Sequence, residues 1–194
     1  MVQPTASTVE SRSTLEPAAG QAAPGVPPPA ETETTWERPG RRYGFLLTVT
    51  TFVFAIDQLS KAIVSATMAP GDVIPLIPPV LDLHRTANTG VAFGLFQRFG
   101  NFFVPVAIVI MAFIFAYYRS LHGPRLWLRT ALGLQLGGAL GNLVDRLRFG
   151  SVVDFIDFHI PALNFQWYIF NLADSAIVIG TGILLFCLTQ RQED

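Results

Sequence analysis

Four long apolar runs constrain what this chain can fold into more than any other feature of its sequence. At 1.5 Å per residue, each run is long enough for a helix that crosses a bilayer core of about 30 Å. A soluble helical domain would need a polar face on each helix, and the second run has none. We therefore expect an all-α membrane protein with four transmembrane helices. The runs cover approximately residues 43–68, 101–118, 126–144 and 167–188.

Residues 1–40 differ in composition from the rest of the chain. The 194-residue sequence is 51% hydrophobic with only 14% charged residues, but residues 1–40 are rich in Pro, Ala, Thr, Ser and Glu. Such a segment buries too little apolar surface to offset the entropy of ordering it. We expect a disordered N-terminal tail over 1–40, distinct from a secretory signal, and one membrane domain over 41–190.

Basic residues near the ends of the runs predict the orientation of the chain. Lys and Arg are enriched in short loops on the cytoplasmic side. Four crossings place the arginines before the first run, between the second and third, and after the fourth on one side. We expect both termini in the cytoplasm and the links 69–100 and 145–166 on the outer side. The inner arginines are Arg38, Arg41, Arg42, Arg119, Arg125, Arg129 and Arg191, against Arg85, Arg98, Arg146 and Arg148 outside.

The first outer link, residues 69–100, has the features of short strands. Residues 73–77 and 80–85 are short candidates for extended structure, and Pro75, Pro78 and Pro79 bar a helix. Residues 88–90 form an Asn-Thr-Gly turn signal. We expect a small extracytoplasmic β-rich element between the first two transmembrane helices, resting on the helix ends at the membrane surface.

Two Asn-x-x-Asp quartets stand at the edges of apolar runs, with a further acid between them. Asn142 and Asp145 end the third run, Asn171 and Asp174 begin the fourth, and Asp154 falls in the link between them. A carboxylate at membrane depth costs about 2.5–3.5 kcal/mol on insertion scales, so Asp174 is a candidate functional residue. All these residues gather at the outer face, which favours chemistry at the membrane surface over transport across it.

The spacing within the quartets predicts how their side chains meet. Helical residues three positions apart share a face, so Asn142 and Asp145 lie on one face of the third helix. Asn171 and Asp174 likewise lie on one face of the fourth. Because the third and fourth helices are antiparallel, we expect each Asn to approach the acid of the other helix. Two nearby carboxylates cannot both ionise cheaply and therefore share one proton. This is the arrangement of an aspartic protease, which needs no metal, cofactor or nucleophilic serine.

Spacing alone does not decide which acid is the partner of Asp174. Asp145 precedes Arg146, and the two are more simply explained as a structural or orienting pair. Asp154 and Asp157 both lie in an apolar stretch, and the choice between them stays open on spacing.

Other kinds of chemistry find less support. The single cysteine excludes an internal disulfide and a multi-cysteine metal site, and three scattered histidines disfavour zinc. A net charge of −1 gives no indication of nucleic acid. We expect neither a metal nor a cofactor. The rival class is a non-enzymatic membrane protein such as a small carrier, although transporters usually have internal repeats and sites at mid-bilayer.

Three glycines at four-residue spacing mark the third run. Gly133, Gly137 and Gly141 would let a neighbouring helix approach closely. They would equally make room for a substrate, and the sequence leaves both interpretations open.

Five motif stretches follow one another along the four runs and carry a family resemblance. They are Asp57-Gln-Leu-Ser-Lys61, Asn88-Thr-Gly-Val-Ala-Phe-Gly94, Gly138-Ala-Leu-Gly-Asn-Leu-Val-Asp-Arg146, Gly150-Ser-Val-Val-Asp-Phe155 and Phe170-Asn-Leu-Ala-Asp-Ser175. In this order the chain resembles the lipoprotein signal peptidases (signal peptidase II), membrane aspartic endopeptidases of bacteria. The resemblance spans nearly all of residues 43–190 and leaves 1–40 outside.

That resemblance implies specific roles. It implies Asp154 and Asp174 as the catalytic pair, and a substrate that is a prolipoprotein cleaved just before a cysteine carrying a diacylglyceryl group. It places the enzyme in the bacterial cytoplasmic membrane, with membrane lipids as further partners; we expect a monomer. The positions implied to hold the site together or to grip substrate are Asp57, Lys61, Asn88, Gly90, Asn142, Asp145, Arg146 and Asn171.

Several polar residues have simpler explanations. Asp57 and Lys61 are four residues apart on one helix, which predicts an intrahelical ion pair of structural importance. Asp82 and Asp157 are expected to be solvated or local capping groups. The histidines His84 and His159 are expected at the interface, without a catalytic role.

Overall fold

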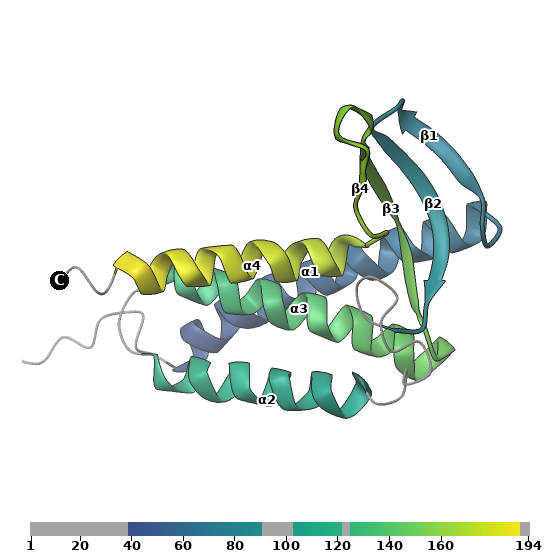
Figure 1. Ribbon diagram of the computed structural model, residues 1–194. Helices are drawn as coiled ribbons and strands as arrows, with labels where there is room; N and C mark the ends of the chain where they lie inside the picture. Colours follow the sequence, from purple (N-terminus) through teal and green to yellow (C-terminus); the bar gives the residue numbers. More distant parts are fainter. Residues whose placement is uncertain (1–38, 91–102, 122–124, 191–194) are drawn as a thin grey trace, which may run out of the picture. The chain divides into compact units, whose positions relative to one another are not determined.

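The computed structural model describes residues 39–90, 103–121 and 125–190 (Figure 1). The predicted tail, apart from its last two residues, and the second half of the motif at 88–94 lie outside the described residues, as do Arg38, Arg98, His122 and Arg191. The helices are α1 Pro39–Thr67, α2 Phe103–Ser120, α3 Leu126–Phe149 and α4 Leu172–Thr189, and the short 3-10 helix η3 is Pro161–Leu163. The strands are β1 Val73–Ile77, β2 Leu81–Asn88, β3 Val152–Ile160 and β4 Phe165–Gln166.

Each predicted apolar run forms one of the four helices, and the largest differences are at the end of α3 and the start of α4. α3 continues to Phe149, where Gly150 adopts the left-handed backbone conformation that ends the helix. α4 begins at Leu172 rather than near 167, because Asn171 is extended and caps the helix with its side chain. Just before this cap, Phe170 pairs with Ile156 of β3 through an isolated β-bridge.

α3 is the central helix and packs against α1, α2 and α4 (Figure 1). A Cβ atom at Gly133 or Gly137 would collide with Val49 or Val53 of α1. The glycines are therefore used for close helix packing, and the alternative interpretation, room for a substrate, is not supported at these positions.

A four-stranded antiparallel sheet in the order β1-β2-β3-β4 stands at one end of the helices (Figure 1). The predicted β-rich element between α1 and α2 supplies only β1 and β2. The other two strands come from the link between α3 and α4, so the all-α class was wrong and the fold is helical with a small sheet. The missed strand β3 is rich in Val, Ile and Phe, which favour strands.

The sheet is attached to the end of α1. Val64 of α1 and Met68, the residue that follows the helix, form a buried cluster with Phe155 of β3. Arg85 of β2 donates hydrogen bonds to the backbone oxygens of Ser65 and Met68. The position of β3 relative to the helices is thereby fixed, which matters because β3 carries Asp154.

Asp157 of β3 is not solvated, contrary to expectation. It is 3% exposed and accepts hydrogen bonds from Gln166 of β4. Imidazole nitrogens of His84 and His159 lie 3.2 and 3.3 Å from its oxygens. Asp157 therefore cross-links the strands.

Charged side chains are buried between the helices and large apolar ones cover their outer surfaces. Phe52, Phe113 and Phe186 are 65%, 73% and 64% exposed, the reverse of a soluble protein. Among the described residues, Tyr43–Thr67 and Leu172–Thr189 are long and apolar enough to cross a membrane, and Val104–Ser120 is a shorter apolar helix.

Candidate active site

The candidate site lies where α3 and α4 meet the sheet, and Asn171 is at its centre. Its side-chain oxygen accepts the backbone N–H of Asp174 at 3.0 Å, and the Asp174 carboxylate accepts the backbone N–H of Asn171 at 3.3 Å. This reciprocal pair is a capping box, which satisfies two donors that a helix start would otherwise leave unpaired. It holds Asp174 in the first turn of α4.

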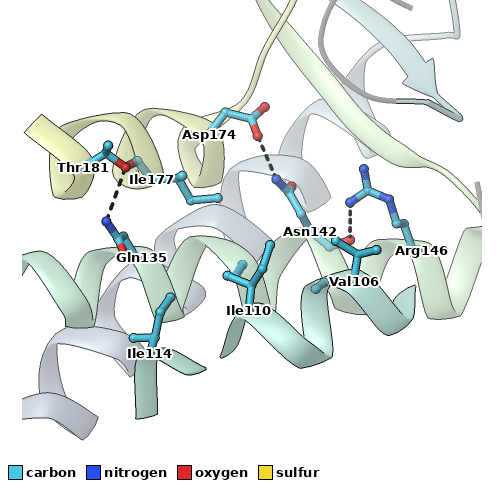
Figure 2. Close-up of a pocket in the computed structure, with 11 residues that line it drawn as sticks. Val106, Ile110, Ile114, Gln135, Asn142, Arg146, Asp174, Ile177 and Thr181 are labelled. Carbon is cyan, nitrogen blue, oxygen red and sulfur yellow. Dashed lines mark hydrogen bonds between the residues drawn. The ribbon is translucent and has the colours of Figure 1, made fainter. Parts of the chain in front are cut away.

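Two amide side chains connect Asp174 with Asp154. Asn142 donates to Asp174 Oδ1 at 2.8 Å, as the facing antiparallel helices predicted (Figure 2). Asn171 donates to Asp154 Oδ1 at 2.6 Å. The expected contact of Asn171 was with Asp145 of the facing helix, and that expectation was wrong. The two amides are themselves joined, because Asn171 Nδ2 lies 3.1 Å from Asn142 Oδ1. The two acids that the resemblance implies as a pair thus belong to one hydrogen-bonded network.

Asp154 is brought to this network by β3 and is 1% exposed. Its second oxygen accepts a hydrogen bond from Asn88 of β2 at 2.9 Å. Burial, and after it the charge of Asp174, raises the pKa of Asp154 to about 7, although Asn88 and Asn171 act in the opposite direction. A carboxyl group of this kind holds a proton near neutral pH.

Lys61 supports the network from α1. Its Nζ atom lies 2.9 Å from carboxylate oxygens of Asp57 and Asp145 and donates to Asn142 Oδ1 at 2.9 Å. The predicted ion pair between Lys61 and Asp57 is therefore present, and Lys61 also pairs with Asp145 of α3. All three charged residues are at most 3% exposed, and their pairing offsets the cost of burying them.

Asp57 reaches from α1 to the start of α4. Its Oδ1 atom accepts the backbone N–H of Ala173 at 3.0 Å. Gly141 makes this approach possible, since a Cβ there would collide with the Asp57 carboxylate. Asp145, which the sequence favoured as a structural or orienting residue, pairs with Lys61 and accepts the backbone N–H of Val153.

Arg146 and Asn88 hold the chain where it leaves β2. Arg146 donates to the backbone oxygens of Asn142 and Gly90 at 3.3 and 3.2 Å. Asn88 Oδ1 accepts the backbone N–H of Gly90 at 2.9 Å. All ten predicted site residues thus lie in one connected region.

A pocket of about 390 Å³ opens beside Asp174, between α2, α3 and α4 (Figure 2). Asp174, Asn142 and Arg146 line one end, and the α2 wall is apolar. Its lining residues are Val106, Ala107, Ile110, Ile114, Gln135, Ala139, Asn142, Arg146, Asp174, Ile177 and Thr181.

Sequence reasoning missed Gln58 and the pocket residues Gln135 and Thr181. Gln58 donates to Asp145 Oδ1 at 3.0 Å and to the backbone oxygen of Gly141 at 3.3 Å. It stands inside the motif at 57–61, but adjacent helical residues do not share a face, so spacing gave it no role beside Asp57. Within the described residues, no group of three or more His, Cys, Asp or Glu side chains is placed to hold a metal ion.

The sequence and structure are similar to those of known proteins. The model of the family described as signal peptidase (SPase) II matches residues 49–190. The lipoprotein signal peptidase of Moorella thermoacetica is 47% identical over 136 residues, which are 70% of this chain and 87% of that protein. That of Pelotomaculum thermopropionicum is 43% identical over 144 residues, 74% of this chain and 91% of that protein.

Solved structures agree with the sequence relatives. One, described as a bacterial membrane enzyme, aligns with a TM-score of 0.72 at 33% identity, covering 77% of this chain and 90% of that one. A second with the same description has a TM-score of 0.68 at 34% identity, covering 75% and 92%. The carboxylate network therefore stands in a bacterial membrane protease fold, and the chain belongs to the signal peptidase II family.

Proposed function

We propose that this chain is an aspartic endopeptidase that removes signal peptides from diacylglyceryl-modified prolipoproteins, cleaving just before the lipidated cysteine. The observation that carries the proposal is the network of two amides that joins Asp154 to Asp174. The names of the sequence relatives support the substrate class.

The chemistry needs one proton shared by the two acids. The ionised carboxylate takes a proton from a water molecule, whose oxygen attacks the scissile carbonyl carbon. The protonated acid donates to the carbonyl oxygen at the same time. The tetrahedral intermediate then breaks its C–N bond, and the proton taken from water passes to the leaving nitrogen. As the new carboxyl group forms, one hydroxyl of the intermediate returns its proton to the acid that protonated the carbonyl oxygen, which restores the singly protonated pair. The raised pKa of Asp154 supports a pair that keeps one proton at neutral pH.

The proposed membrane placement has α1 to α4 crossing four times, with both termini cytoplasmic and the site at the outer face. The arginines near the ends of α2 and α3, Arg119, Arg125 and Arg129, support this orientation. A site at this depth suits a lipidated substrate, because the acyl chains stay in the bilayer and hold the scissile bond near the outer headgroups.

The test is cleavage of a diacylglyceryl-modified peptide by purified protein. We expect Asp154→Asn and Asp174→Asn each to lower kcat/KM about 10²–10⁴-fold, because each removes a proton carrier. Asp72→Asn is the matched control, since Asp72 is an exposed acid in the turn before β1.

The control variant should keep full activity, and a chelator should have no effect on the native protein. Full activity of either Asp154→Asn or Asp174→Asn would contradict the mechanism. Equal cleavage of the same peptide without its diacylglyceryl group would contradict the proposed substrate.

A further inference from the structure

The pocket beside Asp174 continues along the helices to a second polar pair. Gln135 of α3 and Thr181 of α4 line its other end, opposite Asn142 and Asp174 (Figure 2). The wall between the two polar ends is apolar, as Ile110 of α2 illustrates. A pocket that reaches the Asp174 carboxylate is open to the same substrate, so its far end can contact a part of the substrate away from the scissile bond.

The two polar ends are about 10 Å apart along the helix axes. Gln135 precedes Asn142 by seven positions, and Thr181 follows Asp174 by seven positions. At 1.5 Å per residue each interval corresponds to about 10 Å. An extended peptide advances about 3.3 Å per residue, so this span corresponds to about three residues. In the proposed orientation the far end lies deeper in the membrane, on the amino-terminal side of the scissile bond.

Gln135 has hydrogen-bonding capacity to spare. Its Nε2 atom donates to Thr181 Oγ1 at 3.3 Å, and the Thr181 hydroxyl donates to the backbone oxygen of Ile177 at 2.8 Å. The Gln135 carbonyl oxygen and second amide hydrogen meet no partner among the described residues. In an apolar surrounding such groups are costly unless a ligand completes them.

We infer that Gln135, held by Thr181, is a positioning residue that hydrogen-bonds the backbone of the signal peptide about three residues before the scissile bond. The inference rests on the proposed function. A helical segment has its backbone groups already paired, and an acyl chain has none to offer. Only an unwound peptide segment has free N–H and C=O groups, and these need partners at membrane depth.

The first test separates binding from chemistry. We expect Gln135→Leu to raise KM about three- to tenfold and to leave kcat unchanged, because a neutral hydrogen bond far from the reacting atoms is lost. Thr181→Val keeps the side-chain shape and removes the hydroxyl that orients Gln135, so a smaller rise is expected. Gln135→Asn should recover part of the affinity.

The matched control is Thr130→Val on α3. The Thr130 hydroxyl bonds only the backbone oxygen of Leu126 among the described residues and does not line the pocket. It should leave KM unchanged. An unchanged KM in Gln135→Leu would overturn the inference.

The second test locates the contact on the substrate. Replacing the amide bond of the third residue before the cleavage site by an ester removes its N–H and weakens its carbonyl acceptor. We expect this change to weaken binding in the native protein and to have a clearly smaller effect in Gln135→Leu. Equal effects in the two proteins would overturn the inference, and so would a Gln135→Leu defect that changes with acyl-chain length.

Affinities should also be measured in the Asp154→Asn background with a fluorescent lipidated peptide. One outcome is that the native protein does not cleave the peptide but Gln135→Leu weakens its binding. The proposed function then fails and the contact with Gln135 remains. If the native protein cleaves and Gln135→Leu neither raises KM nor weakens binding, the contact fails and the proposed function remains.

Discussion

Asn171 serves the fold and the candidate site with the same side chain. Its oxygen caps α4, and its nitrogen lies 2.6 Å from Asp154 Oδ1 and 3.1 Å from Asn142 Oδ1. Only an amide combines one acceptor with two donor hydrogens at this size. An aspartate at this position would retain the cap and place a third acid against Asp154.

The pKa of Asp154 predicts the pH dependence of cleavage. An acid whose pKa is raised to about 7 holds its proton below that pH and loses it above. When both acids of the pair ionise, no proton remains for the scissile carbonyl. We expect kcat/KM to fall about tenfold per pH unit on the alkaline side of about pH 7, measured between about pH 5 and pH 9.

Asn88→Ala provides the internal check on this profile. The amide of Asn88 donates to the ionised form of Asp154 and so lowers its pKa. Its removal should move the alkaline limb to higher pH. If the alkaline limb stays in place or moves to lower pH, ionisation of Asp154 does not cause the loss of activity at high pH.

How far the sequence predicts the site differs between its residues. The contact between Asn142 and Asp174 follows from helical spacing and antiparallel packing, both of which are local rules. Asp154 does not, because its position depends on how β3 pairs with β2 and packs on α1. Spacing therefore left its role open against Asp145 and Asp157, and only the family resemblance selected it.

At the scale of elements, α3 allows the polar network to form because its glycines face its neighbours. Gly133 and Gly137 face α1 side chains, and Gly141 lies against the carboxylate of Asp57. The main chains approach closely enough for Asp57 to reach the backbone of α4. The polar contacts of the site thus depend on glycines that have no functional side chain of their own.

Gly141→Ala tests this dependence. The added Cβ collides with Asp57, so the contact with Ala173 is weakened and we expect the protein to lose about 1–3 kcal/mol of stability. Thermal unfolding in detergent measures the change. Gly182→Ala in α4 is the control, because a Cβ there meets nothing within 4 Å; equal loss in both variants would show that helix composition, not the contact with Asp57, sets the cost.

The helices were predictable and half of the sheet was not. An apolar run of membrane length allows few structures other than a helix, so the four helices followed from composition. β3 and β4 lie in a link whose apolar residues also suit a loop on a membrane. Only pairing makes them strands, β3 with β2 and β4 with β3. The start of α4 was marked by an Asn-x-x-Asp capping pattern, which the apolar residues before it obscured.

For the whole molecule, the distribution of polarity determines where it can reside. Exposed phenylalanines cover the helices, and the buried interior contains the acids and Lys61. Exposing these apolar side chains to water is unfavourable, whereas the hydrocarbon core of a bilayer has the same apolar character. The proposed orientation then puts the turn before β1 outside and the end of α2 inside.

Single-cysteine labelling tests the orientation. Cys187 is the only cysteine, so Cys187→Ala gives an unreactive background. In intact cells we expect Asp72→Cys to react with a membrane-impermeant maleimide, and Ser120→Cys to react only after permeabilisation. Both positions are exposed at the ends of their segments. The opposite labelling pattern would reverse the proposed topology.

The capping box of α4 has a consequence for inhibitor resistance. Asp174 is both a proposed proton carrier and the residue that closes the first turn of its helix. A compound that binds this carboxylate would therefore leave the bacterium few substitutions with which to escape. In the proposed mechanism, a replacement at this position that evades the drug also removes a proton carrier, and one without a side-chain acceptor also removes the contact with the backbone N–H of Asn171.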